Sequence, residues 1–397
     1  MRPSSAPAPD FVVVEPLRTC CDYYARALDR ADRLRLLGIG TRRGVAGVRP
    51  EVTRLKPAVG LVAYAGAKIL PGFQAESLRF RLHPWIDHWM ERQLQPGDHV
   101  LSSYGYANKC FQFARRHGGK TFLDAGNSHP DNFWEIISKE LRRWKSPYTP
   151  VARHHYERSL AMLEYTDYIL APSSFVARSF LKRGFDPARV WQNPYPVDLS
   201  LFQPAATPRP QNRPLTIIST GSLSLRKGAP YMLEAFRLIR QHHPSARFLL
   251  TQIVENNVHP ILATFRDLPI EWSPPLPHAQ LAERLRGADI FVLPSLEDGF
   301  AVTVAEALAC GLPVITTPNT GASDLITRGL NGEIVPICDA RSIADGILKW
   351  ADTILAKNGP LPAKFDRQIL SPDRFADTFL EQLRELKLVP CAEEMPN

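Results

Sequence analysis

Two acids, Asp298 and Glu306, are separated by seven residues in the segment 291–317, which reads FVLPSLEDGFAVTVAEALACGLPVITT. Gly299 and Phe300 follow the first acid and begin a stretch that predicts a helix, with strand-like apolar runs on either side. The backbone N–H groups and the positive dipole end of such a helix favour phosphate. Carboxylates accept hydrogen bonds from sugar hydroxyls. The segment therefore predicts a site for a phosphorylated, hydroxyl-rich ligand.

A pair of cations, Arg226 and Lys227, follows a strand-like run at 215–220 and precedes a helix-like segment. A cation at this point can neutralise a diphosphate without a metal ion and stabilise the diphosphate as it leaves. An isolated lysine in such a loop is ordinarily solvated. The acidic segment lies one crossover unit further along the chain, so we interpret Lys227 as part of the same site.

These residues must be positioned by a fold in which strand-like and helix-like segments alternate, a pattern typical of parallel sheets wrapped by helices. We expect strands at 11–17, 60–70, 99–105, 120–126, 168–172, 215–223, 247–253, 270–276, 291–294 and 313–317. We expect helices at 23–37, 82–94, 111–117, 133–164 (interrupted by Pro147 and Pro150), 174–185, 230–242, 279–288, 299–311 and 373–386.

The segment 193–214 carries six prolines and little periodicity. Proline stiffens a connection and removes backbone donors, so this segment predicts a domain boundary. We expect Rossmann-like domains at 1–200 and 201–370, and a C-terminal helix and tail at 371–397 that return to the first domain. Two such sheets place a ligand crevice between the carboxyl ends of their strands.

The composition is that of a globular α/β protein with 397 residues and 44% hydrophobic residues. No apolar run reaches the length of about 18 residues that a membrane span needs. The N-terminal segment 1–10 lacks the apolar core of a secretory signal and predicts a disordered tail. The cysteines form no CxxC motif and no Cys/His cluster, which argues against structural zinc and favours a reducing compartment. We therefore expect a cytoplasmic protein.

The net charge of +8 has two interpretations that stay open: a solvated basic surface, or attraction to an anionic membrane or ligand. Basic residues gather at 142–145, 153–155 and 182–183. Nucleic acid is disfavoured as a partner, because no helix-turn-helix, zinc-finger or RNA-recognition signature accompanies the charge.

Several segments together carry a resemblance to a known family. They are FLDAGNSHP (122–130), APSSFVARSFLKRGF (171–185), PYPVDLSLFQP (194–204), GSLSLRKG (221–228), ADIFVLPSLEDGFAVTVAEALACGLPV (288–314) and TGASDLITRGLNGEIVP (320–336). Over roughly residues 100–390 the chain resembles the retaining glycosyltransferases of family four, the group 1 glycosyl transferases. The resemblance implies the GT-B fold, an α/β architecture in which two Rossmann-like domains face each other across a cleft. The first domain would be the acceptor side and the second would bind a nucleotide sugar.

The resemblance also implies roles for single residues. Glu306 would accept hydrogen bonds from the ribose of the donor, and Asp298 would contact hydroxyls of the donor sugar. Lys227 would bind phosphate, the backbone around 300–302 would hold the distal phosphate, and His129 would lie near the reaction centre. The implied catalytic residues are thus His129, Lys227 and Asp298. The implied donor-binding residues are Gly221, Ser222, Arg226, Lys227, Asp298, Gly299, Phe300, Ala301, Val302 and Glu306.

The implied activity is transfer of a sugar, as by a hexosyltransferase, from a nucleotide diphosphate sugar to a hydroxyl of a saccharide or lipid-linked glycan, with retention at the anomeric carbon. No DxD-type carboxylate cluster stands out, so we expect neither a metal ion nor a cofactor. Polysaccharide biosynthesis at the inner face of the membrane, with peripheral contact to anionic lipid, fits this activity. The alternative is a catalytically weak or silent GT-B protein that binds a nucleotide sugar.

That alternative is motivated by departures from the family's pattern. Asp298 stands where the family usually has glutamate, with Glu297 beside it, so either acid could contact the donor sugar. Ser222 stands where the family often has arginine, and Arg226 is a candidate to supply the missing charge. The first strand is followed by EPLRTCCDYY, which contains no glycine, although the family's turn here is commonly glycine-rich.

Other residues allow two interpretations. Asp124 either orients His129 or merely ends its strand. The aromatic pair Phe133 and Trp134 either packs in the core or stacks on an acceptor sugar. The base of the donor is expected near 272–275. For two adjacent pairs the simpler interpretation is preferred: core packing for Cys20 and Cys21, and a solvated helix face for His154 and His155.

Overall fold

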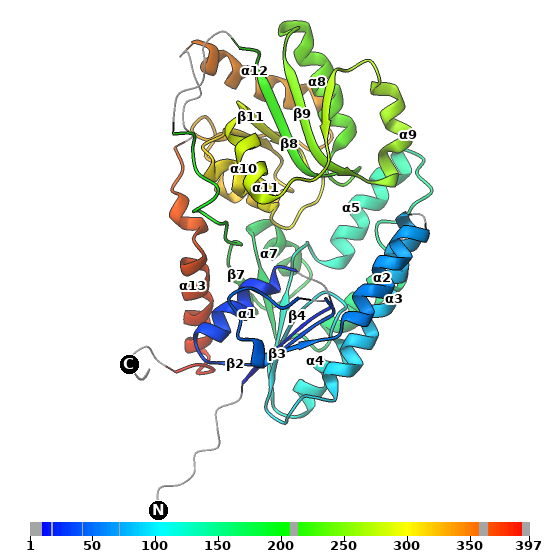
Figure 1. The fold of residues 1–397 in the computed structure, drawn as a ribbon, viewed down its shortest axis with the longest axis vertical. Coiled ribbons are helices and arrows are strands. Elements are labelled where there is room, and N and C mark those ends of the chain that lie inside the picture. The colour runs from blue at the N-terminus through cyan, green and yellow to red at the C-terminus, as the bar shows by residue number, and fades with distance from the viewer. Residues whose placement is uncertain are drawn as a thin grey trace, which may run out of the picture.

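A computed structural model of the protein describes residues 10–16, 19–41, 43–70, 72–206, 213–356 and 364–390. Over these ranges the chain forms two parallel sheets wrapped by helices, one above the other in Figure 1. The predicted disordered tail falls outside the described residues, except for Asp10. The α/β fold of two Rossmann-like domains is confirmed.

In the described part of the first domain, seven strands have the order β3-β2-β1-β4-β5-β6-β7. The strands are β1 (Phe11–Glu15), β2 (Leu34–Ile39), β3 (Thr53–Leu55), β4 (His99–Ser103), β5 (Thr121–Asp124), β6 (Tyr168–Ala171) and β7 (Val190–Gln192). The helices are α1 (Cys21–Arg30), α2 (Pro57–Ile69), α3 (Gly72–Glu91), α4 (Asn108–Arg116), α5 (Pro130–Arg143), α6 (Arg153–Leu163) and α7 (Ser174–Leu181). All five residues of β1, FVVVE, are buried, as expected for a parallel strand covered on both faces.

In the described part of the second domain, six strands have the order β10-β9-β8-β11-β12-β13. The strands are β8 (Thr216–Leu223), β9 (Arg247–Val254), β10 (Ile270–Ser273), β11 (Ile290–Leu293), β12 (Val314–Thr316) and β13 (Gly332–Ile334). The helices are α8 (Ala229–His242), α9 (His259–Leu262), α10 (His278–Arg286), α11 (Val302–Ala309), α12 (Ala340–Ala356) and α13 (Pro372–Glu385). In each sheet the strand order reverses, between β1 and β4 and between β8 and β11, and ligands of such sheets bind at that reversal.

Two of the expected elements near the N-terminus are wrong. The helix expected at 23–37 is α1, which ends at Arg30, and its last residues belong to β2. Asp32, with a left-handed φ of 51°, stands between them and breaks the helix. The strand expected at 60–70 is the helix α2, which begins with Pro57 at a position where proline is favoured. A short apolar run does not distinguish a strand from a helix, which explains the second error.

The C-terminal helix α13 returns to the first domain, as expected. The rings of Phe375 and Phe379 each lie 4.8 Å from the ring of Tyr24 in α1. Arg30, the last residue of α1, forms ion pairs of 2.7 Å with Asp373 and Asp377 of α13. The predicted boundary at residue 200 falls within the connection between β7 and β8 and stays a prediction.

Helix α5 joins the domains a second time. Its residues Ile137 and Leu141 belong to the hydrophobic cluster of the second domain, together with Leu233 and Phe236 of α8. The hydroxyl of Tyr231, also in α8, donates a hydrogen bond of 2.6 Å to Glu140. One helix of the first domain is therefore built into the core of the second.

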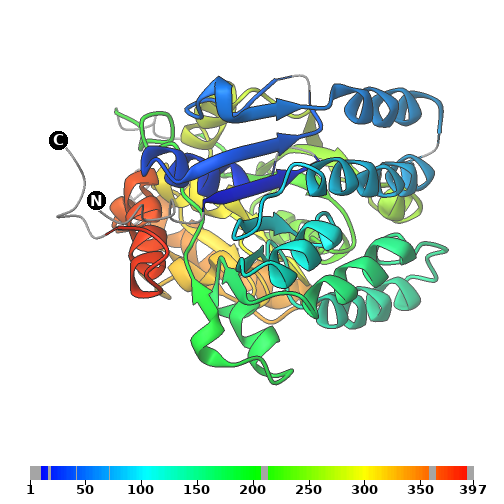
Figure 2. The same cartoon turned by 90° about the horizontal axis from the view of Figure 1, so that it is seen from below.

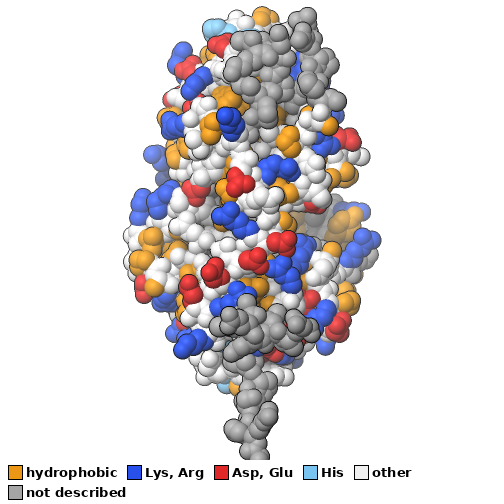
Figure 3. Space-filling model, turned by 90° about the vertical axis from the view of Figure 1, so that its left-hand side faces the viewer, with side chains coloured by type: hydrophobic (Ala, Val, Ile, Leu, Met, Phe, Trp, Pro, Cys, Tyr) orange, Lys and Arg blue, Asp and Glu red, His pale blue; other side chains and the backbone are white. Residues whose placement is uncertain are grey.

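The surface charges are largely interspersed. On the face that carries α13, acidic and basic side chains alternate (Figure 3). Two of the predicted basic patches have acidic neighbours: Arg153 pairs with Glu157 at 2.9 Å, and Arg183 pairs with Glu135 at 3.1 Å. In the ranges that the structure describes, no helix is both long enough and apolar enough to cross a bilayer.

Candidate active site

The carboxyl ends of β8 and β11 bring the predicted cation and the first predicted acid together. Lys227 lies in the loop after β8 and Asp298 in the loop after β11, and the lysine amine forms an ion pair with the carboxylate. Burial acts to raise the pKa of Asp298, but the charges of Lys227 and Arg226, together with hydrogen bonds from Lys227 and Ala301, outweigh it and the pKa falls below its ordinary value. The pair therefore places a fixed cation and a fixed anion at the strand reversal of the second sheet.

The turn before α11 has a strained backbone. Ala301, the residue that precedes the helix, has a left-handed φ of 61°, which is uncommon for a residue other than glycine. Its N–H donates a hydrogen bond of 3.1 Å to the carboxylate of Asp298. Phe300 is buried against Tyr195, with the ring centroids 5.6 Å apart. The amides of Val302 and Thr303 begin α11, so no carbonyl one turn earlier in the helix accepts from them, and they suit an anion.

Glu306 is the second predicted acid, and it lies on α11 with 6% of its surface exposed. Its Oε2 atom has no hydrogen-bond partner among the described residues. Burial raises the pKa of Glu306 to about 8. The carboxylate also acts on Tyr23 of α1: burial, with a smaller contribution from Glu306, raises the pKa of Tyr23 to about 12. Glu306 is therefore a buried acceptor near the first domain that lacks a partner.

Glu297 is held by other residues and is fully buried. Its Oε1 atom accepts a hydrogen bond of 2.9 Å from the backbone N–H of Ser128 in the first domain. Its Oε2 atom lies 3.6 Å from the guanidinium of Arg226, which also donates to the carbonyl of Glu297 at 3.0 Å. This geometry assigns Glu297 to the contact between the domains. Asp298 is then the acid that contacts Lys227, the cation expected to bind phosphate.

Gly299 lies where the two backbones touch. A Cβ atom at this position would stand 2.0 Å from the carbonyl oxygen of Gly126 in the first domain. The carbonyl oxygen of Gly299 accepts a hydrogen bond of 2.7 Å from the hydroxyl of Ser173, also in the first domain. The glycine in the acidic motif is thus required by the close approach of the domains.

Gly221 and Ser222 lie within β8, just before its last residue, Leu223. Gly221 has a left-handed φ of 108° and is exposed, and Ser222 pairs in register with Ile253 of β9. A Cβ atom on Gly221 would lie 3.8 Å from the methyl group of Thr303 in α11. The end of β8 and the first turn of α11 are therefore neighbours.

Among the described residues, His129 makes no hydrogen bond, ion pair or ring contact with Lys227 or Asp298. His129 caps the start of α5, where its Nδ1 atom accepts a hydrogen bond of 3.2 Å from the N–H of Asp131. Its ring packs at 5.2 Å from that of Phe180, and burial lowers its pKa to about 4. The neighbouring residue in the chain, Ser128, makes the contact to the second domain instead.

Asp124 ends β5 and does not orient His129 in any contact seen here. Its carboxylate accepts a hydrogen bond from the hydroxyl of Tyr195, and from Ser103 at 3.3 Å. The thiol of Cys21 donates to it at 3.4 Å. Burial raises the pKa of Asp124 to about 6. The second of the two interpretations, a strand terminus, agrees with this geometry.

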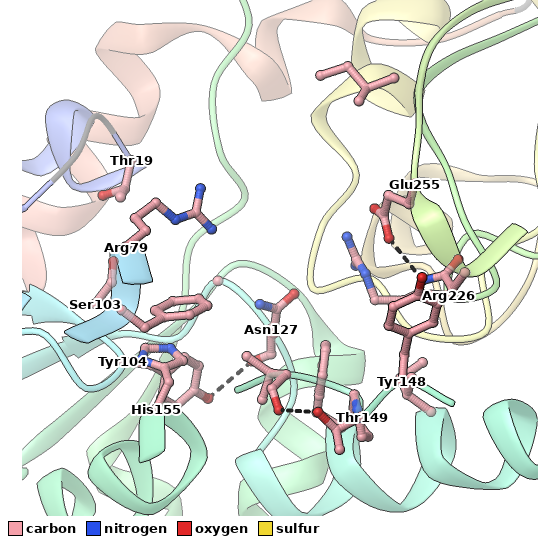
Figure 4. A pocket seen from close by; sticks show the side chains of 18 of the residues that line it. Thr19, Arg79, Ser103, Tyr104, Asn127, Tyr148, Thr149, His155, Arg226 and Glu255 are labelled. Atoms are coloured by element: carbon pink, nitrogen blue, oxygen red, sulfur yellow. Dashed lines mark hydrogen bonds between the residues drawn. The ribbon is translucent and has the colours of Figure 1, made fainter. Parts of the chain in front are cut away.

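A cavity of about 850 Å³ lies between the domains (Figure 4). Its first-domain wall includes Thr19, Cys20, Arg79, Phe80, Ser103, Tyr104, Tyr106, Asn127, Phe133, Tyr148 and His155. Its second-domain wall includes Arg226 and residues 253–257, with Glu255 facing Arg79 across the space in Figure 4. Of the predicted site residues, Arg226 alone lines this cavity. Asp298 and Glu306 are buried and Lys227 is largely buried, and none of the three lines the cavity.

Sequence reasoning missed most of the first-domain wall. Arg79 and Phe80 lie on α3, in a segment with helical periodicity but no motif, so nothing marked them. His155 was expected on a solvated face; it is half-buried, lines the cavity and stacks on Phe80 with ring centroids 3.9 Å apart. Phe133 lines the cavity, whereas Trp134 packs on Tyr156 at 4.5 Å.

Three further expectations have mixed outcomes. Trp272, near which the base was expected, is exposed on β10 and does not line the cavity. Cys21 is buried in the core as expected, but Cys20 lines the cavity. Among the residues that the structure describes, no group of three His, Cys, Asp or Glu side chains is arranged to hold a metal ion. Metal independence stays a prediction.

Comparisons with known proteins agree with this architecture. The solved sucrose-phosphate synthase of Thermosynechococcus elongatus superposes with a TM-score of 0.66 over 95% of this chain and 99% of its own, at 16% identity. HepE of Anabaena, solved with UDP and glucose, gives 0.64 over the same shares, at 11% identity. The two facing sheets thus define a GT-B fold.

A match to a known family covers the second domain. Residues 204–357 match the family described as "Glycosyl transferases group 1". WcaL of Escherichia coli K12, a glycosyltransferase assigned to colanic acid biosynthesis, is 27% identical over 226 residues, which are 55% of this chain and 53% of WcaL. The chain therefore spans about half the length of the curated relatives it matches. Its second domain is similar to the group 1 glycosyl transferases.

Proposed function

We propose that this protein is a retaining glycosyltransferase that works without a metal ion or other cofactor. It moves a sugar, most simply a hexose, from a nucleotide diphosphate sugar to a hydroxyl of a saccharide or lipid-linked glycan. The observation that carries the proposal is Glu306: a buried carboxylate with an unpartnered oxygen, on the helix that begins beside Lys227. An acceptor of this kind needs a polar ligand to satisfy it, and ribose hydroxyls have the required donors.

The chemistry assigned to each residue follows from charge. Lys227 and the first amides of α11 would stabilise the diphosphate as it leaves, because fixed donors in a buried site need no reorganisation. Asp298 would turn from Lys227 to the sugar hydroxyls when the phosphates take its place. His129 is proposed to act near the sugar through its backbone segment, which reaches the second domain at Ser128.

The acceptor is proposed to occupy the cavity between the domains. Its wall is rich in aromatic rings, among them Phe80, Tyr104, Tyr106 and Tyr148, which offer apolar faces to sugar rings together with phenolic hydroxyls. Arg79 and Arg226 on opposite walls would suit an acceptor that carries negative charge. A role in polysaccharide biosynthesis is consistent with relatives such as WcaL, and we propose that the reaction takes place at the inner face of the cytoplasmic membrane.

A direct assay tests the proposal. Purified protein is incubated with UDP-sugars, since HepE was solved with UDP, and nucleotide release is followed with and without a panel of saccharide and lipid-linked acceptors. We expect release that depends on acceptor, is unaffected by a chelator, and yields the same anomeric configuration as the donor by NMR. Glu306→Ala is expected to abolish it. Acceptor-dependent release that persisted undiminished in Glu306→Ala would contradict the site assignment.

One alternative is favoured by two specific observations. Lys227 is already neutralised by Asp298, and the His129 ring serves as a helix cap. A protein that binds a nucleotide sugar without transferring it would show these features too. Tight donor binding in calorimetry, with neither transfer nor hydrolysis of the donor, would support this alternative.

A further inference from the structure

Helix α2 is unusual among the helices of this protein because most of its surface is apolar and exposed. Tyr64 and Ile69 expose 62% and 81% of their surface, and Leu61 and Val62 are also exposed. The opposite side of the helix is fixed: Val59 is buried, and a Cβ atom on Gly66 would stand 2.4 Å from Leu78 of α3. The helix is therefore ordered by one face and presents the other to the outside.

The position of α2 leaves that face uncovered. In Figures 1 and 2 it lies beside α3 at the outer edge of the first domain. The exposed residues 61, 62, 64, 65 and 69 fall on one side of the helix at the helical repeat, so they form one continuous stripe. Contiguous apolar surface of this kind marks an interaction site in a protein of ordinary composition.

Along the segment that carries the stripe, the charge has one sign. Residues 52–75 contain Arg54, Lys56 and Lys68 and no Asp or Glu. Lys56 lies before the first turn of α2 and Lys68 in its last turn, where the amines rest over the rings of Trp89 and Tyr64 at 5.0 and 4.8 Å. Apolar side chains flanked by cations match the chemistry of an anionic lipid surface, whose acyl region accepts the former and whose headgroups attract the latter.

We propose that α2 docks the protein on an anionic phospholipid bilayer, lying in the headgroup region. A helix of 13 residues is about 20 Å long, too short to cross the hydrocarbon core, so it would lie flat. Symmetric pairing of two copies through this face is disfavoured, because it would bring cations toward cations with no acid on the surface to pair them.

Docking through α2 would also place the cavity at the membrane. Helix α3, on which α2 packs, supplies Ala75, Arg79 and Phe80 to the cavity wall. An acceptor held in the bilayer by a lipid could then enter the cavity beside α3. This last step rests on the proposed function, whereas the docking itself rests on α2 alone.

Vesicle flotation with the whole chain tests the docking. Vesicles of phosphatidylcholine alone are compared with vesicles of phosphatidylcholine and phosphatidylglycerol in equal parts, at low and high NaCl. We expect binding to the anionic vesicles that weakens with salt as the charges are screened. The double variant Y64E/I69E is expected to lower the partition coefficient by about tenfold or more, because two exposed apolar side chains become acids. K56Q/K68Q should lower binding to anionic vesicles while leaving any binding to neutral vesicles unchanged.

The matched control is L181E/L330E, which places two acids at exposed leucines of α7 and the second domain and is expected to bind as the wild type does. Wild-type protein that stays unbound with anionic vesicles at low salt would overturn the proposal. So would an equal loss of binding in the control. A dimer in sedimentation velocity without vesicles, converted to monomer by Y64E/I69E, would assign the stripe to a second copy and also overturn it.

The outcome is separable from that of the proposed transfer reaction. Vesicle binding needs no sugar donor, so binding by a protein that transfers nothing would leave the docking surface standing and remove the transferase. Transfer to a soluble saccharide by a protein that binds no vesicle would support the transferase and overturn the docking surface.

Discussion

The amine of Lys227 and the carboxylate of Asp298 form an ion pair at the carboxyl ends of β8 and β11. The residue expected to bind phosphate and the residue expected to contact the sugar thus neutralise each other. Both side chains are largely buried, with 13% and 9% exposed. A diphosphate that binds here must compete with Asp298 for the lysine, and its arrival frees the carboxylate.

Replacement of the cation should therefore lower stability as well as binding. Lys227→Ala leaves a buried carboxylate unpaired, which costs about 3–5 kcal/mol. We expect a clearly lower melting temperature and loss of nucleotide binding in calorimetry. The double variant K227A/D298N removes the unpaired charge and should recover stability without recovering binding. If Lys227→Ala melts at the same temperature as the wild type, the ion pair between Lys227 and Asp298 does not stabilise the fold.

The stability of the protein should depend on pH through the ionisation of Glu306. This carboxyl ionises near 4.5 in the unfolded chain and near 8 in the folded protein. Between these values the folded state keeps a proton that the unfolded state has released, so stability is full below about 4.5 and is lost as pH rises toward 8. Glu306→Gln is neutral at every pH and should melt higher than the wild type at pH 8, by about 2–4 °C per kcal/mol recovered.

The comparison at about pH 4 is the control, because Glu306 is then mostly protonated in the folded and the unfolded chain and the melting temperatures should nearly agree. Nucleotide affinity, measured above pH 8 where the folded carboxyl is ionised, is a second measurement. An amide offers one carbonyl acceptor where a carboxylate offers two oxygens, so Glu306→Gln should bind the nucleotide more weakly by about tenfold. Equal affinity would separate Glu306 from ribose recognition.

The contact between the domains at Gly299 can be tested with a methyl group. Gly299→Ala places a Cβ atom 2.0 Å from the carbonyl oxygen of Gly126, so the domains must move apart. A misplacement of about 1 Å can cost about a hundredfold in rate, and we expect a loss of transfer of that order. A larger radius of gyration in small-angle scattering would report the same separation.

Gly126→Ala adds a methyl group on the other side of the same contact. That Cβ atom meets only the hydroxyl of Tyr195, at 3.6 Å, which is an ordinary contact. We expect near-normal transfer. Equal damage by both substitutions would mean that a general sensitivity of this region, rather than the approach of Gly299, is being measured.

His129 has two proposed contributions, and a pair of substitutions separates them. His129→Asn keeps a side-chain acceptor for the N–H of Asp131, whereas His129→Ala loses the cap at a cost of about 1 kcal/mol. If the residue acts only by shaping the α5 terminus, Asn should retain transfer and Ala should lose part of it together with stability. Loss of transfer in both variants, with His129→Asn as stable as the wild type, would assign a catalytic role to the imidazole.

The alternation of strands and helices was readable from the sequence because it depends on local apolar patterns. It failed where those patterns are ambiguous. GLVAYAGAKIL suits either a strand or a helix, and only the packing of Val59 and Gly66 on α3 decides for the helix. Helix α12, which begins at Ala340, was missed altogether because it lies in a segment judged to lack periodicity.

Those residues of the candidate site that belong to sequence motifs could be predicted. Lys227, Asp298 and Glu306 stand in recognisable contexts, and the fold brings their strand ends together. The ion pair joins residues 71 positions apart, and no local pattern reveals it. The commitment of Glu297 to Ser128 likewise depends on how the domains meet, 169 positions apart in the chain. Arg79 and His155 became visible only with the cavity.

The helix α5 has an implication for how this protein could change its specificity. Phe133, Ile137 and Leu141 line the cavity, and the same side chains pack into the hydrophobic cluster of the second domain. A mutation of these α5 residues that changes the shape of the cavity therefore also changes the packing between the two domains. Laboratory evolution toward new acceptors should therefore draw its successful substitutions from Arg79, Tyr106 and His155, which line the cavity outside α5, and should need compensating changes whenever it touches α5.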